Sequence, residues 1–324
     1  MSTLRSIRTA VALVCAAAVV GCSAQQALEP ADPGRVPPIP AGAKIVTAAP
    51  SAASDESCNP TASLRPSPGI TPGLMPAGST MAKIAARGRL IVGVDQNTFL
   101  FGFRNPKTGL LEGFDIDIAR EMARDILGDP AKIQFQALTS AQRIPALQSG
   151  QVDLVVRSMT ITCKRLQEVA FSTVYFQANQ RILARTNSGI REASDLGEKK
   201  ACATTGSTSI TTMMALRPPP TVYGVADWTD CLVMLQQGQV DAVSTDDSIL
   251  VGLQEQDPYL RVVGPSMSPE PYGIGVSRDT PDLVRFVNGV LDRLRADGTW
   301  QRIYTRWLSG LGAAAAPPPA SYRD

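Results

Sequence analysis

The chain has 324 residues, a net charge of +2 at neutral pH and no histidine. A nearly balanced charge argues against nucleic acid as a partner. The absence of histidine excludes histidine-based catalytic triads, histidine metal sites and a histidine pH switch. The length is sufficient for two domains.

The first 22 residues have the pattern of an export signal. The basic residues Arg5 and Arg8 precede an apolar run from Ala10 to Val20, which is too short to span a bilayer. The small residues before Cys22 resemble a bacterial lipobox, in which this cysteine is lipid-modified and becomes the new N-terminus. We therefore expect residues 1–21 to be a lipoprotein signal peptide and Cys22 to anchor the protein to the cell membrane. A plain secretory signal with an incidental cysteine is the alternative.

Two segments have compositions that cannot bury a core. Residues 22–78 are dominated by Pro, Ala, Ser and Gly, which predicts a partly extended tether. The last residues, 313–324, are rich in Ala and Pro and are predicted to form a flexible tail.

Cysteine usage indicates an oxidising compartment. Cys15 leaves with the signal and Cys22 carries lipid, so four cysteines remain: Cys58, Cys163, Cys202 and Cys231. An even number in an exported protein predicts disulfides. Cys202 and Cys231 flank one compact segment and are predicted to pair, which leaves Cys58 for Cys163. The spacings lack a close cysteine pair, so we expect no metal site, and we expect no cofactor.

Strands and helices alternate from about residue 79, which predicts an α/β fold of two domains with mostly parallel sheets. The first lobe is expected to be discontinuous, with residues 79–177 and 272–312. The second lobe is expected to contain residues 178–271. Two crossing segments, near 176–180 and 268–272, would act as hinges between them.

The stretch from Ser158 to Ser172 contains the first candidate site. An apolar run over 152–156 predicts a buried strand that ends at a polar turn, and Thr162 can cap the helix that follows. A helix start of this kind suits an anion, and the guanidinium fork of Arg165 matches a carboxylate. The alternative is a capped surface helix with a solvated arginine.

This stretch resembles a segment of the family 3 extracellular solute-binding proteins, the polar amino-acid receptors of ABC importers. The similarity includes a threonine-containing strand end, a polar turn and an arginine followed by Phe-Ser, and it extends from about Lys83 to Gly310. It implies a two-lobed periplasmic-binding-protein fold of type II, with an amino acid bound between the lobes. In the family this segment clasps the α-carboxylate of the ligand, which implies that role for Arg165 with Thr160 and Ser158.

The resemblance also implies ligand-binding residues in the second lobe. The family's acid after a strand pairs with the ligand ammonium group, and Asp246, preceded by Thr245, falls on that position. Alternatively, Asp246 caps the helix from Ser248. A glycine-containing turn is expected to hold the remaining polar edge of the ligand, through Thr204, Gly206 and Thr208.

The ligand side chain is indicated by a second arginine. In family members that bind acidic amino acids, a serine and an arginine placed like Ser140 and Arg143 hold the side-chain carboxylate. Alternatively, Ser140 is a helix cap and Arg143 lies on the exposed face. Arg157 and Arg104 would add positive charge nearby. These residues favour Glu and Asp as ligands.

Asp95 favours the amides instead. It lies where glutamine receptors have an aspartate and some acidic-ligand receptors have an arginine, which keeps Asn and Gln as possible ligands. Phe99 or Phe101 is expected to cover the aliphatic part of the ligand. We therefore rank Asp and Glu first and the amides second.

The resemblance predicts a binding protein that is not an enzyme, functions as a monomer and delivers its ligand to a membrane permease. Some dehydratases and lytic transglycosylases share the two-lobed fold, but they need a poised acid in the cleft. The candidates here are Glu112, Glu168 and Asp95, and none lies in a catalytic motif. A sensor that signals to a membrane receptor is the other alternative, because it would use the same ligand-driven closure.

Overall fold

The computed structural model describes residues 39–48, 58–67, 73–312 and 316–324. The expected signal peptide and Cys22 lie outside these residues. In the part of the chain that is described, no helix has both the length and the apolar character needed to cross a membrane.

The first lobe, called lobe 1 below, is built on a five-stranded sheet with the order β6-β2-β7-β14-β8. Its strands are β2 (Leu90–Val94), β6 (Ile133–Ala137), β7 (Leu154–Val155), β8 (Ala170–Phe171) and β14 (Gly275–Val276). Strand β2 is parallel to both β6 and β7. The segments that follow these parallel strands therefore meet at one edge of the sheet, where α/β folds place their ligands.

Helices and a small hairpin sheet complete lobe 1. The helices are α2 (Thr80–Arg87), α3 (Phe114–Leu127), α4 (Arg143–Gln148), α5 (Cys163–Leu166), α9 (Pro281–Ala296) and α10 (Thr299–Leu308), with 3₁₀ turns η1 (Ser140–Gln142) and η3 (Ser309–Leu311). The hairpin sheet contains β3 (Asn97–Thr98), β4 (Gly102–Arg104) and β5 (Leu111–Glu112).

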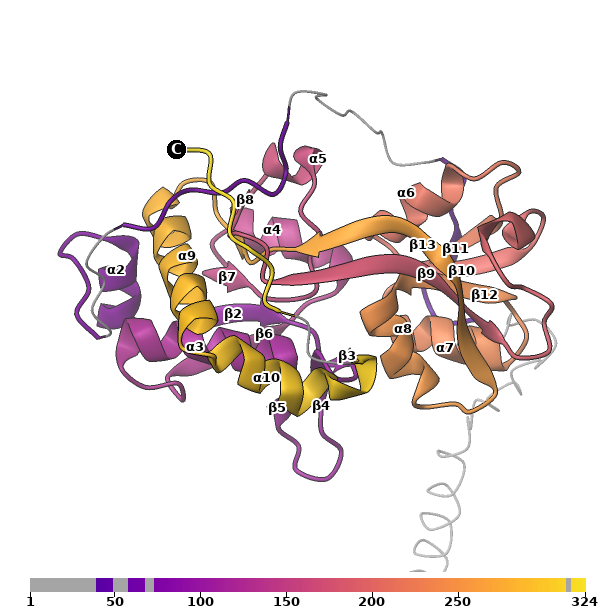
Figure 1. The fold of residues 1–324 in the computed structure, drawn as a ribbon, viewed down its shortest axis with the longest axis horizontal. Coiled ribbons are helices and arrows are strands. Elements are labelled where there is room, and N and C mark those ends of the chain that lie inside the picture. The colour runs from indigo at the N-terminus through magenta and orange to yellow at the C-terminus, as the bar shows by residue number, and fades with distance from the viewer. Residues whose placement is uncertain (1–38, 49–57, 68–72, 313–315) are drawn as a thin grey trace, which may run out of the picture. The chain divides into compact units, whose positions relative to one another are not determined.

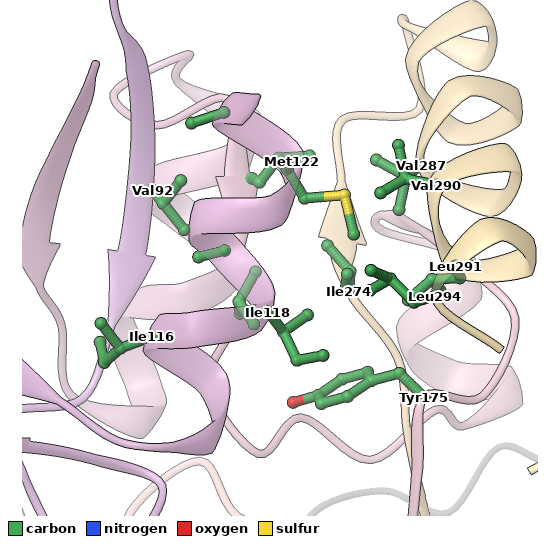
Figure 2. Packing of buried hydrophobic residues seen from close by; sticks show 14 of the residues in the cluster. Val92, Ile116, Ile118, Met122, Tyr175, Ile274, Val287, Val290, Leu291 and Leu294 are labelled. Atoms are coloured by element: carbon green, nitrogen blue, oxygen red, sulfur yellow. The ribbon is translucent and has the colours of Figure 1, made fainter. Parts of the chain in front are cut away.

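Helix α3 lies at the centre of the lobe 1 core. Figure 2 shows it between β2, which contributes Val92, and α9, toward which the side chain of Met122 points. Ile118 and Leu291 are also fully or almost fully buried in this cluster. Burial of one such side chain contributes about 1.5–3 kcal/mol to folding. The core therefore gives the loops at the sheet edge a rigid support.

The second lobe, lobe 2, is built on a six-stranded sheet with the order β1-β11-β10-β12-β9-β13. Its strands are β1 (Lys44–Ile45), β9 (Phe176–Arg185), β10 (Lys200–Thr204), β11 (Thr221–Val225), β12 (Ala242–Asp246) and β13 (Leu260–Tyr272). Its helices are α6 (Thr208–Met214), α7 (Trp228–Gln236) and α8 (Asp247–Gln254), with a 3₁₀ turn η2 (Ala193–Leu196).

Strands β9 and β13 connect the two lobes. They pair antiparallel from Phe176 opposite Tyr272 to Arg185 opposite Leu260, and Figure 1 shows both running from lobe 1 into the sheet of lobe 2. Tyr272 also forms an isolated bridge with Thr160 of lobe 1. These strands are the two crossing segments expected from the sequence.

Both expected disulfides are present in the structure. Cys202 and Cys231 join β10 to α7 inside the lobe 2 core, where both are fully buried. Cys58 and Cys163 join the N-terminal segment to the first residue of α5. The second bond therefore attaches that segment two residues before Arg165.

The segment expected to be a coreless tether differs from that expectation where it is described. Residues 39–48 contain β1, which pairs antiparallel with the edge strand β11, and Val46 packs against the lobe 2 core. Residues 58–67 lie on lobe 1, where the Ser63 hydroxyl donates to the Phe171 carbonyl at 2.7 Å. The open edge at β11 provides a pairing partner for residues 44–45, and Cys163 provides one for Cys58. The composition of the N-terminal segment does not reveal either partner.

The C-terminal residues 316–324, expected to be a flexible tail, are also held. Tyr322 forms a bridge with Ser63, and the Asp324 carboxylate accepts from the Arg65 amide at 2.7 Å and pairs with Arg285 at 2.6 Å. Residues 58–67 and 316–324 contact each other on lobe 1. The sequence of either segment taken alone therefore does not predict this contact.

Candidate functional site

Residues from both lobes enclose a small polar cavity. Its volume is about 10 Å³, which is roughly the space of one water, so the two walls are in contact. The lining residues expected from the sequence are Asp95, Ser140, Arg143, Arg157, Ser158, Thr160, Arg165, Thr208, Thr245 and Asp246. Sequence reasoning missed Thr98, Ser207, Ser209, Trp228 and Ile249, which complete the lining.

Arg165 projects into this cavity from the start of α5. Thr162 caps the helix as expected, accepting from the Arg165 amide at 3.2 Å. The guanidinium is buried and donates to the carbonyls of Thr160 at 2.6 Å and Gly206 at 3.0 Å. Burial lowers the pKa of Arg165, although Glu270, Asp246 and Glu168 oppose that shift. The alternative of a solvated surface arginine is therefore wrong.

Arg143 lies beside Arg165 and is also buried, with only 3% of its surface exposed. Its guanidinium donates to four backbone carbonyls, those of Ser140, Arg157, Ser158 and Gly206, at 3.0–3.3 Å. Burial, then the charges of Arg165 and Arg157, lower the pKa of Arg143. The alternative that Arg143 lies on an exposed face is wrong.

Neither Arg143 nor Arg165 forms an ion pair within the described residues, where every such pair within 4.0 Å involves other arginines. A buried charge whose direct hydrogen-bond acceptors are all neutral is costly, and a well-placed counter-charge offsets that cost. The two guanidiniums share one acceptor, the Gly206 carbonyl, so they stand side by side. The cavity is therefore built to receive anionic groups.

Arg157 differs from the other two arginines because it has its own carboxylate. It pairs with Asp95 at 2.6 Å and donates to the Ser140 hydroxyl at 2.8 Å. Asp95 also accepts from the Thr98 hydroxyl at 2.8 Å and from the amides of the turn that follows β2. The charges of Arg157 and Asp95 thus compensate each other inside lobe 1.

Asp246 supplies a carboxylate from lobe 2, at the end of β12. It is almost fully buried, makes no capping hydrogen bond to α8, and instead accepts from the Tyr272 hydroxyl. The alternative of a simple helix cap is therefore wrong. Burial, and next the neighbouring Glu270, raises the pKa of Asp246 to about 8. A cationic group placed beside it would favour its ionised form.

Thr204 and Gly206 of lobe 2 lie outside the cavity lining, but both contact the lobe 1 wall. The Thr204 hydroxyl donates to the Ser140 hydroxyl at 3.1 Å across the two lobes. Gly206 has a φ of +85°, and a Cβ there would lie 2.8 Å from Cα of Ala141. Glycine at this position permits both the left-handed backbone and the close approach of the two walls.

Three further residues expected to contact the ligand also lie outside the cavity lining. Phe101 is fully buried in the lobe 1 core between Phe114 and Phe176. Phe99 does not line the cavity and packs on Phe103. Arg104 is exposed and donates to the Gly109 carbonyl. The hairpin after β2 turns these side chains away, and this turn could not be located from residue spacing alone.

Trp228 and Ile249 provide the apolar surface instead. They lie near the starts of α7 and α8, directly after the carboxyl ends of β11 and β12. The general position of ligands at strand ends could have drawn attention to both.

The acids considered for catalysis have other partners or positions. Glu112 accepts from Asn105 at 3.0 Å in the hairpin sheet, and Asp95 is paired with Arg157. Glu168 lies in an adjoining groove of about 540 Å³ outside the cavity. In the described ranges, no group of three or more Cys, Asp or Glu side chains is placed to hold a metal ion. The chemistry gathered in the cavity is that of binding a molecule with both charges.

Comparison with known proteins identifies the family. The model of the bacterial extracellular solute-binding proteins, family 3, matches residues 90–310. The chain belongs to this family. One relative, the glutamine-binding protein GlnH of an ABC transporter from Bacillus subtilis, is 40% identical over 230 residues, or 71% of this chain and 84% of that one. The glutamate-binding protein GluB of Corynebacterium glutamicum is 31% identical, covering 68% and 79%.

Solved structures agree with the family 3 assignment. An ancestral arginine-binding protein bound to glutamine has a TM-score of 0.65 and 36% identity, over 68% of this chain and 98% of that one. The ArgBP of T. maritima, as its P235GK mutant, has a TM-score of 0.67 and 31% identity, over 71% and 99%. The predicted family and the predicted two-lobed fold are confirmed.

Proposed function

We propose that this chain captures a free polar amino acid between its lobes, with Glu and Asp preferred to Gln and Asn. The observation that carries the proposal is the pair of buried guanidiniums, Arg143 and Arg165, whose acceptors are all backbone carbonyls. An acidic amino acid has two carboxylates to offer these two arginines. An amide ligand would leave one of them uncompensated.

The remaining groups fit the other parts of such a ligand. Arg165, with Thr160 and Ser158, would hold the α-carboxylate, and Arg143 would hold the side-chain carboxylate. Asp246, a buried carboxyl with no arginine or lysine nitrogen within 4.0 Å in the described chain, would pair with the ammonium group. Trp228 and Ile249, which both line the cavity, would contact the aliphatic carbons.

The pairing of Asp95 supports the acids over the amides. A free aspartate in the cavity would repel a ligand carboxylate and accept from an amide group. Asp95 is held by Arg157 at 2.6 Å, which compensates its charge. The names of the relatives favour the amide instead, since the glutamine-binding protein GlnH is more similar to this chain than the glutamate-binding protein GluB.

We further propose that the protein is a monomeric lipoprotein, anchored through Cys22, that delivers its ligand to the permease of an ABC importer. The motive is the export signal ending in Val-Val-Gly-Cys and the name of the relative GlnH, which belongs to an ABC transporter. Replacing Cys22 with Ala should release the protein from membranes. Unchanged partition into the membrane fraction would refute the lipid anchor.

Calorimetric titration of the purified protein with each of the twenty amino acids tests the ligand. We expect the tightest binding for Glu or Asp, weaker binding for Gln and Asn, and no binding for apolar amino acids. Tighter binding of the amides would overturn the order of preference. No binding by any amino acid would overturn the proposed function.

A further inference from the structure

One buried carboxylate outside the cavity lining touches both lobes. Glu270 lies on the crossing strand β13, opposite Ala178 of β9, and has only 2% of its surface exposed. One of its oxygens, Oε2, accepts from the Thr160 hydroxyl at 2.6 Å and from the Thr208 hydroxyl at 2.8 Å. Its other oxygen accepts from the Ser268 hydroxyl at 2.8 Å. Three hydroxyls therefore satisfy this carboxylate.

The three donors come from different parts of the molecule. Thr160 belongs to lobe 1 and is fixed to β13 by its bridge with Tyr272. Ser268 lies on β13 itself. Thr208 is the first residue of α6 in lobe 2. The hydrogen bonds that Thr160 and Ser268 donate to Glu270 lie within the hinge and the lobe 1 wall. The hydrogen bond from Thr208 connects the lobe 2 wall to the same carboxylate.

We propose that Glu270 is a positioning residue that couples closure of the cleft to the alignment of Thr160 and Thr208, which both line the cavity. This inference rests on the proposed amino-acid binding. When the lobes close, Thr208 reaches an acceptor that already holds Thr160, so a single carboxylate oxygen fixes one hydroxyl on each wall. Separation of the lobes removes one of the three donors from a buried charge, which is unfavourable and favours the closed arrangement.

The surroundings of Glu270 support this role over that of an ion pair. Within the ranges that the structure describes, no lysine or arginine nitrogen lies within 4.0 Å of its carboxylate. Its charge instead acts at longer range on the ligand-binding groups, where it opposes the lowered pKa of Arg165 and adds to the raised pKa of Asp246. Glu270 also borders the groove of about 540 Å³ that adjoins the cavity.

The test begins with Thr208→Val, which keeps the shape of the side chain and removes the donor on lobe 2. We expect glutamate to bind about tenfold more weakly, the lower end for a hydrogen bond to a charged group. The Thr208→Ser variant keeps a hydroxyl at this position and should bind glutamate within about twofold of the wild-type protein. Thr212→Val is the matched control, since Thr212 lies on the same helix and in the same groove.

A double-mutant cycle separates this role from direct contact between Thr208 and the ligand. If Thr208 acts through Glu270, then Thr208→Val should have much less effect in the Glu270→Gln background than in the wild-type background. Additive effects of the two changes would overturn the proposal. Thermal unfolding of each variant verifies that the fold is retained.

Interlobe distances give a readout that needs no ligand. Spin labels placed at the exposed positions Lys83 on α2 and Gln237 after α7 should report a longer mean distance, or a broader distribution, for Thr208→Val and Glu270→Gln than for the control variant. Wild-type distances in both variants would overturn the proposal. Because this measurement is made without an amino acid, it remains decisive even if the proposed ligand is wrong.

Discussion

The two walls of the cleft differ in their chemistry. The lobe 1 wall contains three buried arginines, and their guanidiniums are held mainly by groups of lobe 1 itself, such as the carbonyls of Thr160 and Ser140 and the carboxylate of Asp95. The lobe 2 wall contains small hydroxyl residues, two apolar side chains and the single acid Asp246. Lobe 1 is therefore organised in advance to receive anionic groups, and lobe 2 completes the site when it closes.

This difference assigns separate tasks to the walls. A ligand that first meets lobe 1 finds guanidiniums already oriented by backbone carbonyls, which reduces the ordering required on binding. In the proposed binding mode, lobe 2 then supplies Asp246 as the counter-charge for the ammonium group and excludes water. The Gly206 carbonyl, which accepts from both Arg143 and Arg165, belongs to lobe 2. Its bonds hold the walls together where ligand carboxylates would bind.

The largest expected effects come from removing one charge from each wall. Arg165→Ala and Asp246→Ala should each weaken amino-acid binding by about 2–5 kcal/mol, or roughly 30-fold to several thousand-fold, because each leaves a buried ligand charge unpaired. Calorimetry measures the loss, and thermal unfolding verifies the fold. Arg104→Ala is the control, because Arg104 is exposed, lies outside the cavity lining and donates to a hairpin carbonyl. Near-native affinity in either folded variant would mean that the ligand binds elsewhere.

The second arginine of lobe 1 should decide between acids and amides. Arg143→Met keeps most of the side-chain volume and removes the charge. We expect Glu and Asp to lose about tenfold to a hundredfold in affinity, and Gln and Asn to lose much less, because an amide cannot accept both charge-assisted hydrogen bonds from the guanidinium. Competition titrations with the four ligands measure the ratio. An equal loss for all four would show that Arg143 only supports the fold.

The single acid of lobe 2 should make binding depend on pH. The pKa of Asp246 is raised to about 8 by burial and by Glu270, so its carboxyl is mostly protonated at pH 6. A ligand ammonium group favours the ionised form, and binding must therefore release a proton. Affinity should rise with pH between 6 and 8, by up to about tenfold per pH unit, and level off above about 8.

Calorimetry in two buffers with different ionisation enthalpies counts the released protons. Tyr272, Glu270, Asp247 and Arg143 also face this carboxyl, so the midpoint belongs to the coupled set. Asp246→Asn, titrated at higher ligand concentration, should release none. Proton uptake by the wild-type protein, or no exchange between pH 6 and 8, would contradict the assignment.

A local sequence signal accounts for one predicted part of the site. Arg165 lies in the first turn of a helix that follows a buried strand and is capped by Thr162, and this pattern is contained in about ten consecutive residues. The ligand-binding roles expected for Asp246 and Arg143 came from the resemblance to the family.

The parts that were missed depend on contacts between segments far apart in the chain. Phe101 was expected in the cleft. It lies in the core instead, because the chain turns back in the hairpin after β2 and the side chain of Phe101 is buried there. Glu270 touches Thr160 across 110 positions. The pairing of residues 44–45 with β11 requires an edge strand nearly 180 residues away. No local pattern encodes these distances.

The smallest expected effect tests whether the lobes must dock closely. Gly252 lies in α8 of lobe 2, and a Cβ there would be 2.8 Å from the Phe99 carbonyl oxygen of lobe 1. Alanine favours a helix over glycine by about 1 kcal/mol, so Gly252→Ala should not destabilise lobe 2 itself. It should instead hinder closure, because the contact is with backbone that cannot rotate away.

We expect Gly252→Ala to weaken glutamate binding by about threefold to tenfold, with a thermal unfolding temperature no lower than that of the wild-type protein. Its interlobe distance should also be longer. Gly310→Ala is the matched control, since nothing lies within 4 Å of a Cβ at that exposed position. If Gly252→Ala binds as tightly as the control, the lobes do not need this contact to trap the ligand. The other contacts between the walls, made by Thr204, Gly206 and Thr208, would then be sufficient for high affinity.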